Sequence, residues 1–201
     1  MSFRAAFEAI SPLGDASWRQ LERAAPEEVR FAKGERLLSE GERARFVFGV
    51  KQGLLREFYV DQDGGEATRV FIAEGGLSGS LADLLSGEPA LVNIEALEPT
   101  RVWRVPFAHL QALVDTDPAW ARLALRQAQG LYLRKVRREH EMLTMDARAR
   151  YLAFRALNPG LDSRVPLHLV ASYLGITPVH LSRIRGAPRA PRRPPARRRR
   201  S

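Results

Sequence analysis

The sequence predicts an α+β protein: an N-terminal antiparallel β-roll (jelly-roll), one long helix and a C-terminal helix-turn-helix. Three observations predict this order. Short apolar runs alternate with Gly-bearing turns between residues 29 and 105, helical spacing begins after Pro106, and residues 166–186 combine a Gly turn with a helix N-cap. The 201 residues are 45% hydrophobic and 27% charged, which supplies enough apolar material for a core.

Strand-length runs separated by turn residues indicate the β-roll. The runs are RFVFGV (45–50), LLREFYV (54–60), TRVFIA (68–73), VNIEAL (92–97) and TRVWRV (100–105). Asp63-Gly64 between two of these runs is the clearest hairpin signal. Ahead of the roll, residues 16–25 predict a short amphipathic helix with Trp18 and Leu21 on one side and Pro26 ending it.

Asp117-Pro118 marks the expected start of a long helix that runs to about Leu143, and a further helix is expected over 144–157. Within the long helix, one apolar seam contains Leu125, Ala128, Tyr132, Val136 and Leu143, and a second apolar edge contains Trp120, Ala124 and Leu131. Two apolar sides predict two packing partners. We expect the β-roll on one side and, as a homodimer interface, the same helix of a second subunit on the seam of Leu125, Ala128, Tyr132 and Val136; burial within one chain is the alternative.

Residues 166–186 read as a helix-turn-helix. Pro166 suits a first helical position, and Gly175 suits the φ > 0 end of that helix. Thr177 is a good N-cap for a second helix, whose Leu181 and Ile184 face the first. The expected DNA-binding residues are Thr177, Pro178, Val179, His180, Ser182, Arg183 and Arg185. These side chains can meet base edges and phosphates in a major groove, although an ordinary helical hairpin remains the alternative.

The net charge of +9 is concentrated at one end of the chain. The nine arginines between Arg183 and Arg200 account for the whole excess, so residues 1–182 are formally neutral. The Arg- and Pro-rich segment 187–201 is expected to be disordered. The chain has no cysteine, which excludes disulfides and thiolate metal sites. Because no membrane span or secretory signal is recognisable, we expect a cytoplasmic protein without a membrane partner.

The order of β-roll, long helix and helix-turn-helix resembles the family of the cyclic-AMP receptor protein and Fnr (the Crp/Fnr family). The resemblance covers residues 27–185 and rests on FAKGERLLSEGE (31–42), VKQGLLREFYV (50–60) and LVASYLGITPVHLSRIR (169–185). It implies a DNA-binding transcription regulator that acts as a homodimer on double-stranded DNA, with RNA polymerase as a further partner. The implied units are a cyclic-nucleotide-binding-like sensor (1–115), a dimerisation helix (116–143), an incomplete DNA-binding domain (144–186) and a tail (187–201).

The sequence departs from the nucleotide-binding members of that family in the expected effector pocket. Those members hold ribose and cyclic phosphate with a Gly-Glu pair and a later Arg-Ser pair. Gly79 keeps the glycine, but Ser80 stands at the Glu position, and Ala90 and Leu91 stand at the Arg-Ser positions. Because these side chains give a phosphate no cation, we expect no cyclic AMP binding. The pocket of Gly79, Ser80, Leu81, Ala90 and Leu91 is expected to take an unknown, apolar small-molecule effector or none. The missing cysteines exclude an Fnr-type iron–sulfur switch.

A second departure follows Arg185, where the family continues into further helix and a β-hairpin wing. Arg/Pro repetition stands there instead, which indicates a truncation or an altered reading frame. The alternative function is therefore a family member that dimerises but no longer binds DNA specifically.

Catalytic and metal-binding motifs are not found. The four histidines form no H-E-x-x-H pair, and GLSGS (76–80) lacks the final Gly of a nucleophile elbow. Asp61 and Asp63 suit a hairpin turn better than a calcium loop. We expect no enzyme activity, no catalytic residues, no cofactor and no metal.

Overall fold

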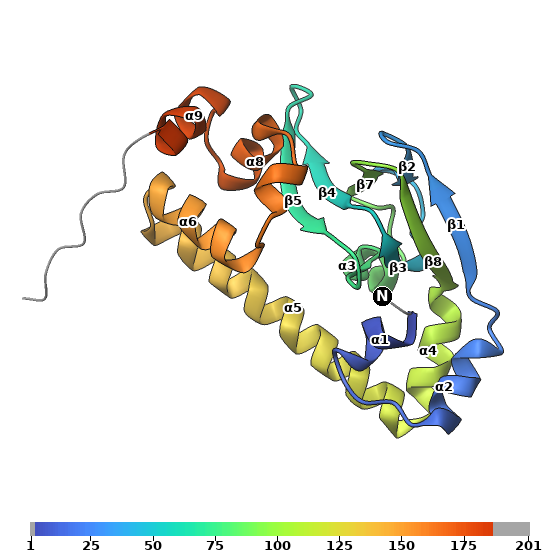
Figure 1. Cartoon of the computed structure of the whole chain (residues 1–201). Coiled ribbons are helices and arrows are strands. Elements are labelled where there is room, and N and C mark those ends of the chain that lie inside the picture. The colour runs from blue at the N-terminus through green and yellow to red at the C-terminus, as the bar shows by residue number, and fades with distance from the viewer. Residues whose placement is uncertain (1–2, 187–201) are drawn as a thin grey trace, which may run out of the picture.

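The computed structural model describes residues 3–186 and contains an antiparallel β-roll, a long helix and a C-terminal helical unit (Figure 1). This is the α+β architecture that the sequence predicts. The strands are β1 (Glu27–Phe31), β2 (Arg36–Leu38), β3 (Phe46–Gln52), β4 (Leu55–Val60), β5 (Glu66–Ile72), β6 (Leu77–Ser78), β7 (Asn93–Ala96) and β8 (Thr100–Pro106). The helices are α1 (Phe3–Glu8), α2 (Asp15–Glu22), α3 (Leu81–Ser86), α4 (Phe107–Thr116), α5 (Pro118–Thr144), α6 (Ala147–Leu157), α7 (Leu161–Arg164), α8 (Leu167–Leu174) and α9 (Pro178–Gly186).

Two four-stranded antiparallel sheets form the roll. Their strand orders are β1-β8-β3-β6 and β2-β7-β4-β5, and the apolar faces meet in a core that includes Val50, Leu55 and Ile94. The expected Asp63-Gly64 hairpin joins β4 to β5. Asp61 Oδ1 accepts hydrogen bonds from the N–H groups of Asp63 and Gly65, so a turn, as expected, explains these acids.

Helices α1 and α2 cover one end of the roll together with α4 and the start of α5. Phe3, Phe7 and Trp18 pack there with Trp120, whose indole Nε1–H donates to the carbonyl of Ser17 at 3.1 Å. The sequence predicts α2, although over 16–25 rather than the observed Asp15–Glu22, and it does not predict α1. Six residues without a capping motif carry too weak a periodic signal, and burial of Phe3 and Phe7 supplies the stability of α1.

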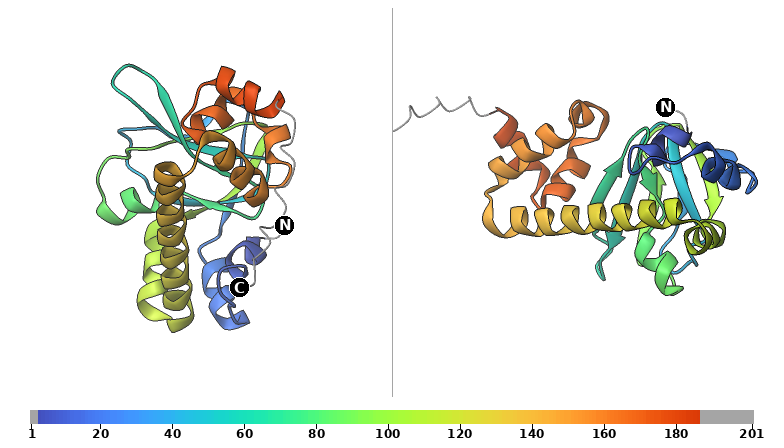
Figure 2. Two further views of the ribbon diagram at one scale, coloured as in Figure 1. Left: turned by 90° about the vertical axis from the view of Figure 1, so that its left-hand side faces the viewer. Right: turned by 90° about the horizontal axis from the view of Figure 1, so that it is seen from below.

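Helix α5 runs past the roll and on to the C-terminal unit (Figure 2). As predicted, Asp117 caps it by accepting the N–H of Ala119 at 2.8 Å, and Pro118 occupies the first turn. The next helix starts later than predicted. Asp146 caps α6, so α6 begins at Ala147 rather than at 144, because a carboxylate that accepts the N–H of Ala149 at 2.7 Å fixes the helix start.

A hydrophobic cluster joins the C-terminal helices to the outer face of the roll. Leu54 and Phe71 of the roll share it with Phe154, Leu169 and Leu181. The packing of α8 along β5 therefore fixes the helix-turn-helix against the sensor-like roll in this structure (Figure 1). The predicted disordered segment 187–201 lies outside the described residues.

Candidate nucleic-acid interface and effector cassette

Helices α8 and α9 form the helix-turn-helix that the sequence predicts. Gly175 ends α8 with φ of +66°, a conformation that costs glycine little, and its N–H donates to Ser172 O at 3.1 Å. Val170, Ala171 and Leu174 are buried. The first boundary differs from the prediction by one residue: Pro166 is the N-cap, with ψ of 139°, and α8 begins at Leu167.

Thr177 and Leu181 orient the second helix. Thr177 Oγ1 accepts the His180 N–H at 3.2 Å, which satisfies one free donor of the first turn. Leu181 is fully buried, and Ile184 packs against the same core. All seven residues expected to bind DNA lie exposed on the remaining surface of α9 and its cap: Thr177, Pro178, Val179, His180, Ser182, Arg183 and Arg185.

The two arginines of this surface keep their charges available. Within residues 3–186, neither Arg183 nor Arg185 forms an ion pair, whereas many other arginines do. An exposed guanidinium is a planar donor that suits phosphate oxygens or the O6/N7 edge of guanine. The arrangement can therefore present two cations, an imidazole and a hydroxyl to an acidic groove.

Residues 79–91 contain α3 and all five residues predicted to line the effector pocket, and we call this segment the cassette. The carboxylate of Asp83 lies inside it. Asp83 is buried, and its Oδ2 accepts the Ser80 hydroxyl at 2.5 Å and the Leu91 N–H at 3.3 Å. Ser80 itself adopts φ of +45°, a left-handed conformation that is uncommon for serine. The Ser80 hydroxyl and the Leu91 N–H thus already donate hydrogen bonds to a carboxylate of the protein itself.

The five residues predicted to line an effector pocket have different surroundings. Ala90 lies in the core, where its N–H donates to Glu42 O at 2.7 Å, while Leu91 is 68% exposed and Leu81 is half-buried. A Cβ on Gly79 would lie 2.7 Å from Phe46 O, so only glycine fits there. A surface hollow of about 420 Å³ borders this segment, because Glu42 and Phe46 line it, but none of the five residues does; its lining is Leu37, Leu38, Glu42, Arg43, Ala44, Arg45, Phe46 and Phe48.

A second buried carboxylate, Glu57, forms a polar site that is not among the predicted site residues. Its two oxygens accept hydrogen bonds from Arg69 Nη1 at 2.6 Å and from the Ser78 hydroxyl at 2.8 Å. In the sequence, the adjacent charges of Arg56 and Glu57 interrupt the apolar residues of β4, and this is the signal that points to a buried polar group there.

The seam of α5 is exposed over most of its length. Leu125 is 59% and Tyr132 is 66% exposed, and Ala128 and Val136 are exposed as well. Of the second apolar edge, Trp120 is buried in the cluster at the end of the roll, whereas Ala124 and Leu131 are half-buried; Leu123, which is not part of the predicted edge, is buried in the same cluster. An apolar stripe of this length is unusual on the surface of a monomer.

The described residues give no sign of a metal centre or a membrane span. No group of three or more His, Asp or Glu within residues 3–186 is placed to hold a metal ion. Over the same residues, no helix is both long and apolar enough to cross a bilayer.

Comparison with known proteins agrees with this architecture. Residues 28–117 match the model of the cyclic nucleotide-binding domain family. The transcriptional activator protein Anr of Pseudomonas aeruginosa is 32% identical over 116 residues, which are 56% of this chain and 44% of that protein. The fumarate and nitrate reduction regulatory protein of Vibrio cholerae is 23% identical over 190 residues, 87% of this chain and 73% of that protein. The chain thus spans less than half the length of Anr.

Solved structures share the fold. FixK2 from Bradyrhizobium japonicum superposes with a TM-score of 0.69 at 23% identity, over 79% of this chain and 82% of that one. The catabolite activator protein of Thermus thermophilus gives a TM-score of 0.56 at 20% identity, over 90% and 84% of the two chains. The protein therefore has a β-roll of the cyclic-nucleotide-binding type, followed by a long helix and a helix-turn-helix. Residues 28–117 thus match a cyclic nucleotide-binding domain, and the whole chain is similar in fold to the regulators of the Crp/Fnr family that its motifs resemble.

Proposed function

We propose that the chain is a DNA-binding transcription regulator of the Crp/Fnr type. The observation that carries the proposal is the exposed outer surface of α9, with Arg183 and Arg185 free of ion pairs within the described residues. The names of the relatives support it, because Anr is a transcriptional activator protein and the Vibrio cholerae relative is a regulatory protein. We assign no enzymatic activity and no cofactor to the chain, and we place it in the cytoplasm, with RNA polymerase as a further partner.

In this proposal the protein acts as a homodimer. The exposed seam of Leu125, Ala128, Tyr132 and Val136 would pair with the same seam of a second copy, since burial of apolar surface drives such helix pairs. The functional units would be a sensor (1–115), a dimerisation helix (116–143), a DNA-binding unit (144–186) and a tail (187–201).

The cassette is proposed not to bind cyclic AMP or cyclic GMP. Asp83 occupies the donors around α3, and its negative charge would repel a phosphate. Ala90 and Leu91 offer no cation that would compensate. An effector, where the protein uses one, would be an uncharged or apolar small molecule.

Selection of binding sites from randomised duplex DNA at physiological salt tests the proposal. We expect enrichment of a palindrome, and Arg183→Ala should lower the preference for it by about 1–3 kcal/mol per half-site if the contact to guanine is bidentate. The control is Arg43→Ala, because Arg43 is an exposed arginine of the β-roll, far from α9 in the sequence. Intact protein that enriches no sequence would refute specific binding and favour the family member that dimerises without reading DNA.

A further inference from the structure

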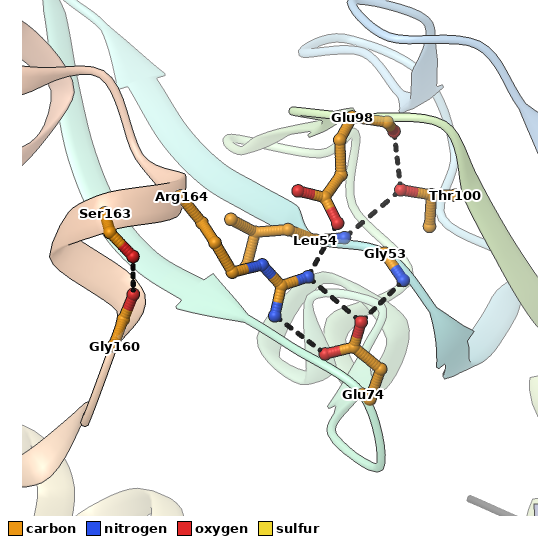
Figure 3. Close-up of polar contacts among 8 residues, drawn as sticks. All are labelled: Gly53, Leu54, Glu74, Glu98, Thr100, Gly160, Ser163 and Arg164. Carbon is orange, nitrogen blue, oxygen red and sulfur yellow. Dashed lines mark hydrogen bonds and ion pairs between the residues drawn. The ribbon is translucent and has the colours of Figure 1, made fainter.

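Arg164, the last residue of α7, reaches across from the C-terminal helical unit to the β-roll. Its guanidinium binds Glu74 through both terminal nitrogens, at 2.9 Å and 3.0 Å, and Glu98 at 2.6 Å (Figure 3). Glu74 lies in the turn between β5 and β6, and Glu98 lies in the turn between β7 and β8. One side chain therefore ties two turns of the roll to the segment that immediately precedes α8.

The roll fixes the carboxylate of Glu74 and the main chain at Glu98. Glu74 Oε1 also accepts the Gly53 N–H at 2.9 Å (Figure 3). The carbonyl of Glu98 accepts the Thr100 hydroxyl at 2.7 Å, and the same hydroxyl oxygen accepts the Leu54 N–H at 3.2 Å. The pair with Arg164 lowers the pKa of Glu74 to about 2, so its carboxylate is charged at any physiological pH. A bidentate arginine–carboxylate pair also fixes direction, because its two parallel hydrogen bonds restrict rotation.

A second polar contact joins the same two units at a different place. β5 is the edge strand of its sheet, and the Thr68 N–H on it donates to Ser172 Oγ of α8 at 2.9 Å. That hydroxyl donates in turn to Glu66 O at 2.8 Å. Apolar packing of α8 on β5 holds the two units together, and the polar contacts of Arg164 before α8 and of Ser172 near its C-terminal end add directional restraints at two separate places.

The contact does not cover the surface proposed to bind DNA. Val179, His180 and Arg183 remain exposed while Arg164 is bound to the roll. The interaction is therefore suited to orienting the recognition helix and unsuited to hiding it. Orientation matters for a dimer, because two recognition helices must reach major grooves separated by about 34–36 Å.

We propose that Arg164 is a positioning residue that, through Glu74 and Glu98, holds the helix-turn-helix in the orientation required for both half-sites of a palindrome. This proposal rests on the proposed DNA-binding function. Its physical basis is a population effect. A helix-turn-helix that samples several orientations spends less time in the competent one, and the apparent affinity for the full site falls by that fraction. Affinity for a single half-site does not depend on the spacing and is unaffected.

The first experiment measures orientation without DNA. The chain contains no cysteine, so Cys introduced at Lys33 of the roll and His168 of α8, both exposed, can carry a pair of spin labels. The labelled chain is diluted with unlabelled protein, so that distances within one chain are measured. We expect one narrow distance in the parent and a broadened or split distribution in Arg164→Gln. The control is Arg155→Gln, because Arg155 pairs with Asp162 at 3.0 Å, which is a contact inside the helical unit.

The second experiment measures binding to a full palindrome and to a duplex with one half-site, both taken from the site selection. Arg164→Gln should weaken binding to the palindrome by about tenfold and leave half-site binding within about twofold. Glu74→Gln/Glu98→Gln should reproduce this effect without altering α7, and the triple variant should bind no more weakly, because all three act through one contact.

The outcomes separate this proposal from the function on which it rests. A distance distribution that is unchanged in both Arg164→Gln and the double Gln variant would overturn it, as would equal losses on the half-site and the palindrome. If the parent protein prefers no DNA sequence, the regulator function fails, while the spin-label distances still decide whether Arg164 sets the orientation.

Discussion

Replacing Leu125 by Asp should convert the protein from a dimer into a monomer. Leu125 is 59% exposed in the single chain, and burying the rest of a leucine is worth roughly 1–2 kcal/mol per copy. A symmetric interface loses this twice and also brings two carboxylates together in an apolar seam. We therefore expect dimerisation to weaken by about 4 kcal/mol or more, which corresponds to about a thousandfold in Kd.

Sedimentation velocity over a concentration series measures this effect directly. The matched control is Leu152→Asp, because Leu152 is 55% exposed but lies on α6, away from the seam. The control should remain a dimer, and both variants should keep the circular dichroism spectrum of the parent. A Leu125→Asp protein that still sediments as a dimer would show that the seam of α5 is not the interface.

Three further predictions concern the cassette, the turn of the helix-turn-helix and the ion cluster of Glu74. Calorimetry should detect no micromolar binding of cyclic AMP or cyclic GMP, because the missing charged contact at Ala90 alone costs roughly 1.5–3 kcal/mol; a micromolar Kd would contradict this. Gly175→Ala should lower the free energy of unfolding by about 1–2 kcal/mol, because φ is +66° at this position. Gly130→Ala in the middle of α5 should instead raise it by up to about 1 kcal/mol. Equal effects of the two substitutions in urea unfolding would refute the backbone argument. The pKa of Glu74 is about 2 in the folded protein and near 4.5 when unfolded, so its carboxylate stabilises the fold above pH 4.5 and this stabilisation is lost as the pH falls toward 2. Because its side chain is 36% exposed, solvent screening limits the effect to about 1–2 kcal/mol, and the gap in urea midpoints between parent and Glu74→Gln should narrow from pH 6 to pH 3; a constant gap would contradict the assignment.

Features that depend on neighbouring residues could be predicted from the sequence. The Asp63-Gly64 turn, the start of α5 at Pro118 and the Thr177 cap each involve bonds within four residues, so local residue types decide them. The burial of Leu181 follows from the same local periodicity. This is why the helix-turn-helix has the predicted form, with one boundary displaced by a single residue.

Contacts between distant segments could not be predicted in the same way. Arg164 pairs with Glu74 across 90 sequence positions, and nothing near either residue distinguishes it from other surface charges. No local motif singles out Asp83, because the fold brings its carboxylate to the Leu91 N–H eight positions later. Identifying such pairs requires the strand order, because the order decides which turns become neighbours.

Under the proposed function, the distribution of ion pairs, rather than the net charge alone, makes α9 the surface that attracts DNA. Residues 1–182 are formally neutral, and many of their charged side chains pair with one another. For example, Glu28 binds Lys51 and Arg101, and Glu57 binds Arg69. Within the described residues, Arg183 and Arg185 have no such partner, so the positive potential remains where the helix is most exposed. The salt dependence of binding should therefore reflect contacts near α9 and in the Arg-rich segment that follows it, and the β-roll should contribute little. Only contacts from α9 can distinguish base pairs, which is why Arg183→Ala should change specificity while loss of the following arginines should weaken binding to all duplexes alike.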